Sequence, residues 1–274
     1  MGPARGRRVG RPPSGRLISS LDSLRLVESE RLILHEAHDE ERLERLRVRV
    51  ATEREQRNPV VVSSCDDGYL VLDGAHRVRV LGELGYPLVL VQLVEPPARA
   101  ESWGHLLEGV DPEALRGVEE IEACDDPCEN PVAVTEFGGA TGRGRGRAYL
   151  RARGEGLGGD VRALWGLQSL YPRGAQVRRV DPEEPFEPAP EESLIRYRPF
   201  TPAELVEVVR SGAVLPAGIT RFRISERVLG VRYPLKGMEN GDLPARNREL
   251  DAFVRRRWEE HRIRYYGEPV VLFE

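Results

Sequence analysis

Lysine is nearly absent from this chain of 274 residues. Of its 41 lysines and arginines only Lys236 is a lysine, and no G-x-x-x-x-G-K-[ST] stretch occurs. A P-loop needs that lysine to reach the terminal phosphates of a nucleotide. The sequence therefore excludes a P-loop, and any phosphate-binding site must use arginine, histidine or backbone amides.

Cysteine is also scarce, with three residues at Cys65, Cys124 and Cys128. An odd number argues against a framework of disulfides. Cys124 and Cys128 form a C-x3-C pair with no second pair beside it, so a structural zinc site is not expected. His35 and His38 stand three residues apart, whereas the H-E-x-x-H zinc motif needs four.

Long apolar runs and an excess of positive charge are missing too. No apolar stretch approaches membrane-spanning length, and the net charge of -4 provides no overall field that would draw the chain onto nucleic acid. Residues 1–20 are basic, rich in glycine and proline, and lack the apolar core of a secretory signal. We expect a disordered basic tail at 1–20, no membrane contact and a cytoplasmic protein.

The first third of the chain alternates between strand and helix patterns. The expected elements are a strand within 21–36, a polar helix at 38–53, a hairpin of strands 58–64 and 69–74, a helix at 75–85 and a strand at 88–96. Such alternation predicts an α/β or α+β unit, which we place at residues 21–100.

The remaining residues, 101–274, are expected to form a second mixed α/β domain that completes a substrate site. Its predicted parts are a polar helical stretch at 101–123, a basic mobile loop at 137–159, an exposed acidic connector at 180–193, a helix, turn and strand within 201–222, a helix at 247–267 and a final strand at 268–274. The glycine, proline and charge patterns carry these assignments.

The stretch VLDGAHRVRVLGELGYP places Asp-Gly-Ala-His-Arg where a strand turns into a helix. The unpaired N–H groups of a helix's first turn attract anions. Asp73 could cap that turn, Gly74 permits an unusual backbone angle, and His76 and Arg77 could bind phosphate. The alternative is an ordinary capped helix at the surface.

This stretch resembles the D-G-H-H-R element of the ParB/sulfiredoxin fold, and further stretches narrow the resemblance to the free L-serine kinases of that superfamily. They are LHEAHDEERLERL at 34–46, SWGHLLEG at 102–109, LPAGITRFRISERVLGVRYPL at 215–235 and IRYYGEPVVLFE at 263–274. The resemblance implies Mg²⁺-assisted phosphoryl transfer from ATP or ADP to the hydroxyl of a free amino acid. L-Serine is the leading substrate, and O-phospho-L-serine for amino acid metabolism is the product.

The resemblance also implies roles for single residues. Glu36 would be the base that accepts the hydroxyl proton, although it could instead be a residue of a helix's first turn. Gly74, Ala75, His76 and Arg77 would hold the nucleotide phosphates. Asp73 would help to position Mg²⁺ or the attacking hydroxyl, or would only cap the helix.

Substrate binding in these kinases uses a tryptophan and a T-R-H stretch, which match Trp103, Thr220 and Arg221. Trp103 could instead be a core or rim aromatic, and Thr220 an ordinary strand residue. The third position is Phe222 rather than histidine. Either a neighbour such as Arg223 or His105 takes over the polar contact, or the substrate is another, less polar hydroxylated metabolite.

Two other functions share the motif. A ParB-like nucleotide- or DNA-binding regulator would explain D-G-A-H-R and the tail GRRVGRPPSGR, which resembles a minor-groove AT-hook. That class carries a helix-turn-helix after the motif domain, and the sequence predicts none. A sulfiredoxin-like reductase needs a cysteine in the motif, where Ala75 stands.

Overall fold

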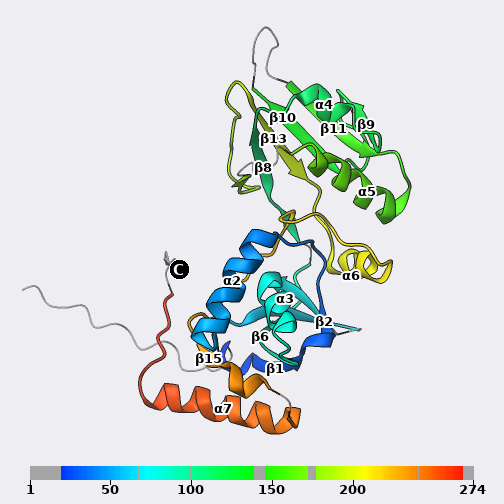
Figure 1. Cartoon of the computed structure of the whole chain (residues 1–274). Helices are drawn as coiled ribbons and strands as arrows, with labels where there is room; N and C mark the ends of the chain where they lie inside the picture. The colour runs from blue at the N-terminus through cyan, green and yellow to red at the C-terminus, as the bar shows by residue number, and fades with distance from the viewer. Residues whose placement is uncertain are drawn as a thin grey trace, which may run out of the picture.

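The computed structural model describes residues 20–66, 68–98, 100–138, 146–171, 177–239 and 241–267. The predicted tail, apart from Ser20, and the predicted final strand at 268–274 lie outside these residues. Two large sheets form the lower and upper parts of the molecule in Figure 1, with α6 beside their junction.

The lower sheet is mixed, with strand order β1-β6-β4-β5-β2. Its strands are β1 (Leu24–Glu28), β2 (Leu32–Ile33), β4 (Val60–Cys65), β5 (Gly68–Asp73) and β6 (Leu88–Val94). The predicted hairpin is confirmed, because β4 and β5 pair antiparallel. Successive residues of β4 point to different cores, with Val60 and Val62 on one side and Val61 on the other. The sheet is therefore covered on both faces.

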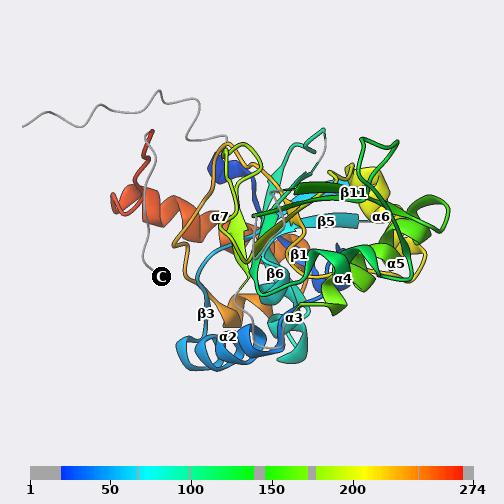
Figure 2. The same ribbon diagram turned by 90° about the horizontal axis from the view of Figure 1, so that it is seen from above.

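Three helices pack against the lower sheet. They are α2 (Glu40–Glu53), α3 (Ala75–Glu83) and α7 (Leu243–Glu259). The helices α2 and α3 lie side by side in both views, and α7 runs along β1 (Figures 1 and 2). Asp39 begins α2, where its side chain accepts a 2.8 Å hydrogen bond from the Arg42 N–H. Gly85, with φ 78°, follows the end of α3 as predicted.

The upper sheet is antiparallel throughout, with strand order β12-β8-β13-β10-β11-β9. Its strands are β8 (Gly104–Glu108), β9 (Ile121–Cys124), β10 (Ala133–Phe137), β11 (Gly146–Ala152), β12 (Arg178–Val180) and β13 (Glu192–Tyr197). Its helices are α4 (Pro112–Arg116), α5 (Gly156–Ser169) and α6 (Pro202–Arg210). The predicted helix, glycine stop and strand within 201–222 are confirmed as α6, Gly212 and β14 (Thr220–Arg221).

Two predictions in this region were wrong. The stretch 101–123 is mainly β7 (Glu101–Ser102), β8 and β9, with only the five residues of α4 helical between them. In β8, Leu106 and Leu107 face different cores, so the strand lacks the polar–apolar alternation that would have identified it. The predicted loop at 137–159 contains β11, whose buried Ala148 and Leu150 alternate with arginines.

The chain returns to the lower sheet near its C-terminus. The short elements there are β15 (Tyr233–Pro234), which pairs with β3 (Glu55–Gln56), and the 3-10 helix η2 (Leu235–Met238); a second 3-10 helix, η1 (Ser29–Arg31), follows β1. Leu235 and Leu250 join the core of the lower sheet. The domain boundaries at 21–100 and 101–274 stay a prediction, and the cores group residues beyond about 226 with the first unit. Within the described ranges, no helix has both the length and the apolar character needed to cross a bilayer.

Candidate active site

Glu36 lies at the junction of the two units, held by the segment that leads into β14. Its backbone forms an isolated bridge with Leu215, supported by 2.8 Å hydrogen bonds on either side. Its Oε2 accepts from the Gly218 N–H at 3.0 Å, and its Oε1 accepts from the Thr220 N–H at 2.5 Å and from the Thr220 hydroxyl at 2.6 Å. Because α2 begins at Glu40, the alternative that Glu36 belongs to a helix's first turn is wrong.

Gly218 is a position that favours glycine. Its φ of 77° lies in the left-handed region, and a Cβ there would overlap the Nη2 atom of Arg179. The backbone of Ile219 also accepts a 3.0 Å hydrogen bond from the Trp103 N–H. The segment 215–220 thus connects Glu36 on one side with β7 and Trp103 on the other.

His35 contacts the Glu36 carboxylate indirectly, through the Thr220 hydroxyl. Its side chain is 6% exposed, and its Nε2 lies 2.9 Å from the Thr220 hydroxyl oxygen. Burial lowers the pKa of His35, while the negative charge of Glu36 opposes that change. Since the Thr220 hydroxyl donates to Glu36, a neutral His35 must donate to Thr220 from Nε2. The Phe222 ring packs edge-on against His35 at 5.8 Å between centroids.

His105 occupies a polar chain inside the upper unit. Its Nε2 lies 2.8 Å from the Gly218 carbonyl and its Nδ1 lies 2.9 Å from the Tyr171 hydroxyl, which pairs in turn with the Tyr197 hydroxyl. Burial lowers the pKa of His105 to about 4. Both ring nitrogens are engaged, so His105 does not supply the contact that histidine would make at position 222.

Charged side chains surround the indole of Trp103. The Arg221 guanidinium lies 4.3 Å from the ring centroid and that of Arg179 lies 6.0 Å away. Arg221 forms ion pairs with Asp181 and Glu101. The second proposed substitute, Arg223, is likewise held by carboxylates, with Glu101 at 2.7 Å and Glu183 at 2.8 Å.

The N-terminus of α3 differs from the expectation in one respect. Gly74, with φ 101°, is the capping residue, and no side chain caps this helix end, so the prediction that Asp73 caps it was wrong. Asp73 Oδ2 instead accepts from Arg77 at 3.1 Å and from Arg227 at 2.6 Å. Burial alone would raise the pKa of Asp73, but these two guanidinium groups lower it.

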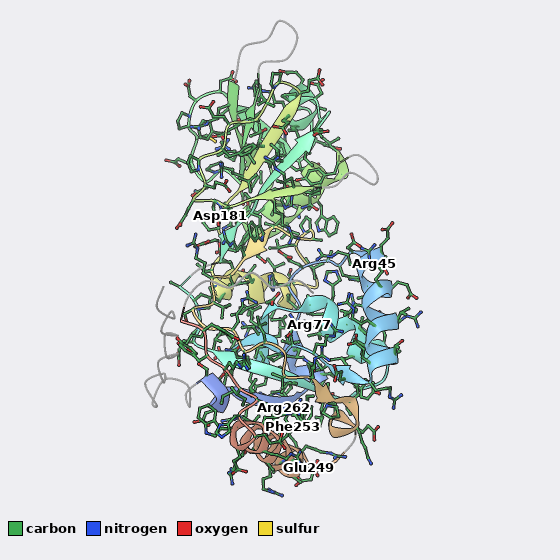
Figure 3. All side chains as sticks on the ribbon, turned by 90° about the vertical axis from the view of Figure 1, so that its left-hand side faces the viewer. Arg45, Arg77, Asp181, Glu249, Phe253 and Arg262 are labelled. Atoms are coloured by element: carbon green, nitrogen blue, oxygen red, sulfur yellow. The ribbon has the colours of Figure 1, made fainter. Side chains whose placement is uncertain are left out.

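The Arg77 guanidinium binds backbone carbonyls of the protein instead of pointing into solvent. Its Nη1 donates to the carbonyls of Asn58, at 3.0 Å, and Pro59. Figure 3 shows Arg77 within the lower unit, whereas Asp181 lies at the lower end of the upper unit. The uncapped N–H groups of the first turn, rather than the Arg77 side chain, are the anion-attracting part of the motif.

His76 connects this helix end with the beginning of α2. Its Nε2 accepts a 3.3 Å hydrogen bond from the Asp39 N–H. Burial lowers the pKa of His76, and the positive charges of Arg42 and Arg179 lower it further. The charge of Arg179 also interacts with Glu36. Arg179 therefore lies within electrostatic reach of both the motif and Glu36, and no sequence pattern pointed to it.

The described residues form no metal centre from protein side chains alone. Over the described ranges, no group of three or more histidine, cysteine, aspartate or glutamate side chains could hold a metal ion. The Asp73 carboxylate, for which positioning of Mg²⁺ or of the attacking hydroxyl was one alternative, is engaged by two arginines. Phosphate oxygens of a bound nucleotide and water would supply most of the Mg²⁺ ligands.

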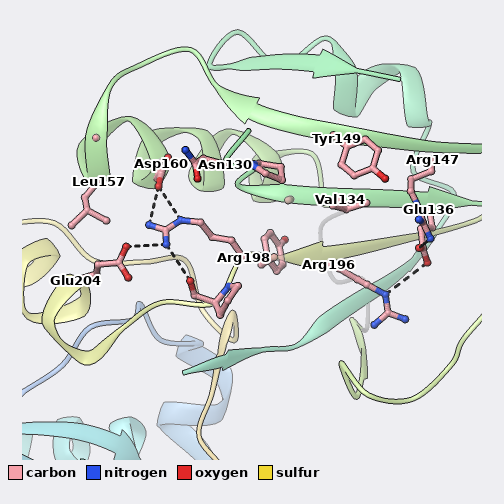
Figure 4. A pocket seen from close by; sticks show the side chains of 15 residues that line it. Asn130, Val134, Glu136, Arg147, Tyr149, Leu157, Asp160, Arg196, Arg198 and Glu204 are labelled. Atoms are coloured by element: carbon pink, nitrogen blue, oxygen red, sulfur yellow. Dashed lines mark hydrogen bonds and ion pairs between the residues drawn. The ribbon is translucent and has the colours of Figure 1, made fainter. Parts of the chain in front are cut away.

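A separate groove of about 920 Å³ lies in the upper unit and contains none of the predicted site residues (Figure 4). Its charges pair with one another: Arg198 contacts Asp160 at 2.9 Å and Glu204 at 3.0 Å, while Arg147 and Arg196 flank Glu136. The groove thus offers little unpaired charge for a ligand.

Comparisons with known proteins identify relatives of one kind, although no family model matches the chain. The chain is 28% identical over 257 residues to the ATP-dependent L-serine kinase SbnI of Staphylococcus aureus, covering 92% of this chain and 98% of that protein. It is 29% identical over 114 residues to an ATP-dependent L-serine kinase of Staphylothermus marinus, covering 37% and 45% of the two chains.

The solved structures that resemble this chain include SbnI and a free serine kinase. The structure of C-terminally truncated SbnI from Staphylococcus aureus superposes with a TM-score of 0.76 at 25% identity, covering 88% of this chain and 99% of that one. A mutant free serine kinase in complex with ADP superposes with a TM-score of 0.59 at 17% identity, covering 79% and 94%. The predicted fold class, α/β (α+β), is confirmed, with helices packed on two separate large sheets.

Proposed function

We infer that this chain, a homologue of the free serine kinases and a phosphotransferase that acts on a hydroxyl group, phosphorylates a free amino acid. ATP or ADP is the proposed donor, with Mg²⁺, and L-serine is the leading acceptor, giving O-phospho-L-serine. The observation that carries the proposal is the Glu36 carboxylate, held by three hydrogen bonds at the junction of the two units.

Glu36 is the proposed general base. An alcohol is a weak nucleophile, and a carboxylate within hydrogen-bond reach accepts its proton as the new bond to phosphorus forms. A carboxylate has about four acceptor positions, and the donors from Gly218 and Thr220 fill three of them. One position on Oε2 remains for the substrate hydroxyl, and the rigid donors hold it in a fixed direction.

The N-terminus of α3 is the proposed site for the nucleotide phosphates. The backbone from Gly74 to Arg77 offers N–H groups at the positive end of the helix dipole. Neutral His76 can donate a hydrogen bond from Nδ1, because its Nε2 accepts from Asp39. In this arrangement Asp73 acts indirectly, by holding Arg77 and Arg227 beside the helix.

Trp103, Thr220 and Arg221 are the proposed substrate contacts. Phe222 is buried against His35, which places an apolar edge where a histidine would be polar. This observation favours a second candidate within the same reaction class, a hydroxylated amino acid with a larger or less polar side chain. Threonine and homoserine are therefore part of the first assay.

The test is phosphorus NMR of the purified protein with Mg²⁺, ATP or ADP, and L-serine, threonine or homoserine. A new phosphomonoester signal is expected with at least one acceptor. The variant Glu36→Gln should lose about 10²–10⁴-fold in turnover while nucleotide still raises its unfolding temperature, because only the base is removed.

The matched control is Glu41→Gln, which alters an exposed carboxylate of α2. Turnover in Glu36→Gln equal to that in Glu41→Gln would contradict the role of Glu36. If the unaltered protein forms no phosphoester with any acceptor, the proposed kinase is wrong, and a nucleotide-binding regulator becomes the function to test.

A further inference from the structure

Arg179, on β12 of the upper unit, is the side chain that links the two halves of the proposed site. We propose that its guanidinium binds the phosphoryl group during transfer, as a catalytic residue between the nucleotide at α3 and the hydroxyl at Glu36. This role rests on the proposed kinase function and assigns to that site a residue which no sequence motif identifies.

The position of Arg179 is the first argument. Its Nη2 atom lies directly over the Cα of Gly218, where a Cβ would overlap it. The Gly218 N–H donates to Glu36 Oε2 at 3.0 Å, so the guanidinium lies close to the proposed base. On its other side the charge of Arg179 reaches His76 in the first turn of α3. The guanidinium is therefore within electrostatic reach of both the N-terminus of α3 and Glu36, the two places that the proposed transfer connects.

The missing counter-charge is the second argument. Arg221, its neighbour at Trp103, and Arg223 are both held by Glu101 and Asp181. Within the described part of the chain, the Arg179 guanidinium forms no ion pair and no hydrogen bond. The charge of Glu36 acts on it without direct contact, because the hydrogen bonds of that carboxylate come from Gly218 and Thr220. The guanidinium is thus a cation beside the base whose five N–H donors are available to an anion.

The chemistry of the transfer explains why a cation is needed there. The substrate hydroxyl oxygen forms a bond to the terminal phosphorus, and its proton passes to Glu36. The bond from that phosphorus to the bridging oxygen breaks, and its electron pair leaves with the nucleotide. Negative charge therefore grows on the bridging and equatorial oxygens, which a planar guanidinium binds in a two-pronged manner. In a chain without a P-loop lysine, an arginine can supply this positive charge.

The neighbouring residue provides a matched control. Arg178 precedes Arg179 on the same strand, and its guanidinium stacks on Phe186 at 4.8 Å from the ring centroid. Arg178 and Arg179 carry the same charge and are both exposed. Because successive residues of a strand point to opposite faces, the Arg178 side chain has different neighbours from that of Arg179.

The experiment compares Arg179→Ala, Arg179→Lys and Arg178→Ala with the unaltered protein in the phosphorus NMR assay, over a range of L-serine and nucleotide concentrations. Arg179→Ala should lower kcat by about 10³-fold or more, with much smaller changes in KM, because the contact forms in the transition state. Guanidinium ion added at non-denaturing concentration should restore part of the rate in Arg179→Ala. Arg178→Ala should match the unaltered protein.

The outcomes separate this role from the proposed function. If the unaltered protein turns over and Arg179→Ala equals Arg178→Ala, the role of Arg179 is wrong and the kinase stands. A loss confined to KM for L-serine would assign Arg179 to the substrate carboxylate and overturn the role in transfer. No turnover in the unaltered protein would overturn both. If Arg179→Ala does not fold, the rate and the KM values of Arg179→Lys decide in the same way.

Discussion

At the scale of single residues, the buried histidines explain how an apolar junction holds a carboxylate in one orientation. Neutral His35 donates to the Thr220 hydroxyl, which donates to Glu36. Neutral His105 contacts the carbonyl of Gly218, whose N–H donates to Glu36. A carbonyl can only accept, so His105 donates from Nε2 and accepts from Tyr171 at Nδ1. Each histidine acts as a neutral donor to a group that in turn binds Glu36.

The lowered pKa of His105 predicts a dependence of stability on pH. The pKa is about 4 in the folded protein and about 6.5 in the unfolded chain, so the unfolded chain binds the proton more readily between these values. The free energy of unfolding should therefore fall as the pH falls from about 6.5 to 4, with a contribution from His105 on the order of 3 kcal/mol.

Urea unfolding of His105→Gln at several pH values measures this contribution. The variant should lose part of the pH dependence between about pH 6.5 and pH 4, since glutamine does not titrate. His261→Asn, which alters an exposed histidine, is the control. Identical pH dependence in His105→Gln and the unaltered protein would show that folding does not lower the pKa of His105.

At the scale of elements, α3 depends on the glycine that caps its N-terminus. Gly74 adopts a left-handed backbone angle, and a Cβ there would lie 2.8 Å from Cζ of Arg77. That guanidinium also binds Asp73 and the carbonyls of Asn58 and Pro59. The turn therefore packs against the arginine that holds β5 to the loop before β4, and the motif is a structural unit as well as a proposed anion site.

The change Gly74→Ala should destabilise the protein by about 1–2 kcal/mol for the backbone angle, and by more if Arg77 cannot move. The control is Gly82→Ala in the interior of α3, where no atom lies within 4 Å of the added Cβ. That change should stabilise by about 0.5–1 kcal/mol, because alanine favours the helix. Denaturant unfolding of both variants measures the difference, and equal effects at the two positions would contradict the assignment.

At the scale of the whole molecule, the chain runs from the lower unit to the upper one and then returns. The segment 215–222 connects Glu36 with β7, and α7 then packs along β1. Leu250 is the buried residue of α7 and belongs to the core of the lower sheet. The C-terminal helix is thus expected to stabilise the unit that carries the proposed phosphate-binding motif.

Leu250→Ala should lower the free energy of unfolding by about 2–5 kcal/mol, because it removes buried methyl groups from a packed core. Asp251→Ala, at the next and exposed position of α7, should change it by less than about 0.5 kcal/mol. Thermal or urea unfolding compares the two. A small loss in Leu250→Ala would show that α7 contributes little to the lower unit.

Local patterns in the sequence determined the helices α2, α3, α6 and α7, the β4–β5 hairpin and the strand-to-helix turn at Asp73–Arg77. These elements have short-range signals: helical spacing, turn glycines and apolar runs of strand length. They could not identify β8, because a strand buried on both faces loses its alternation, or β11, because its stretch is rich in the glycine and arginine typical of loops. Pairing with β13 makes β8 a strand, and pairing with β10 and β9 makes β11 one.

Only the tertiary structure decided which polar groups meet. Glu36 and Thr220 are 184 residues apart, Asp73 and Arg227 are 154 apart, and His105 and Gly218 are 113 apart. Such contacts depend on how two sheets pack at one junction, and no local pattern records that. The sequence alone determined the chemistry available to the site, which is arginine, histidine and backbone amides without lysine. Long-range packing determined that carboxylates hold Arg221 and Arg223, whereas the Arg179 guanidinium lies near Glu36 without an ion pair among the described residues.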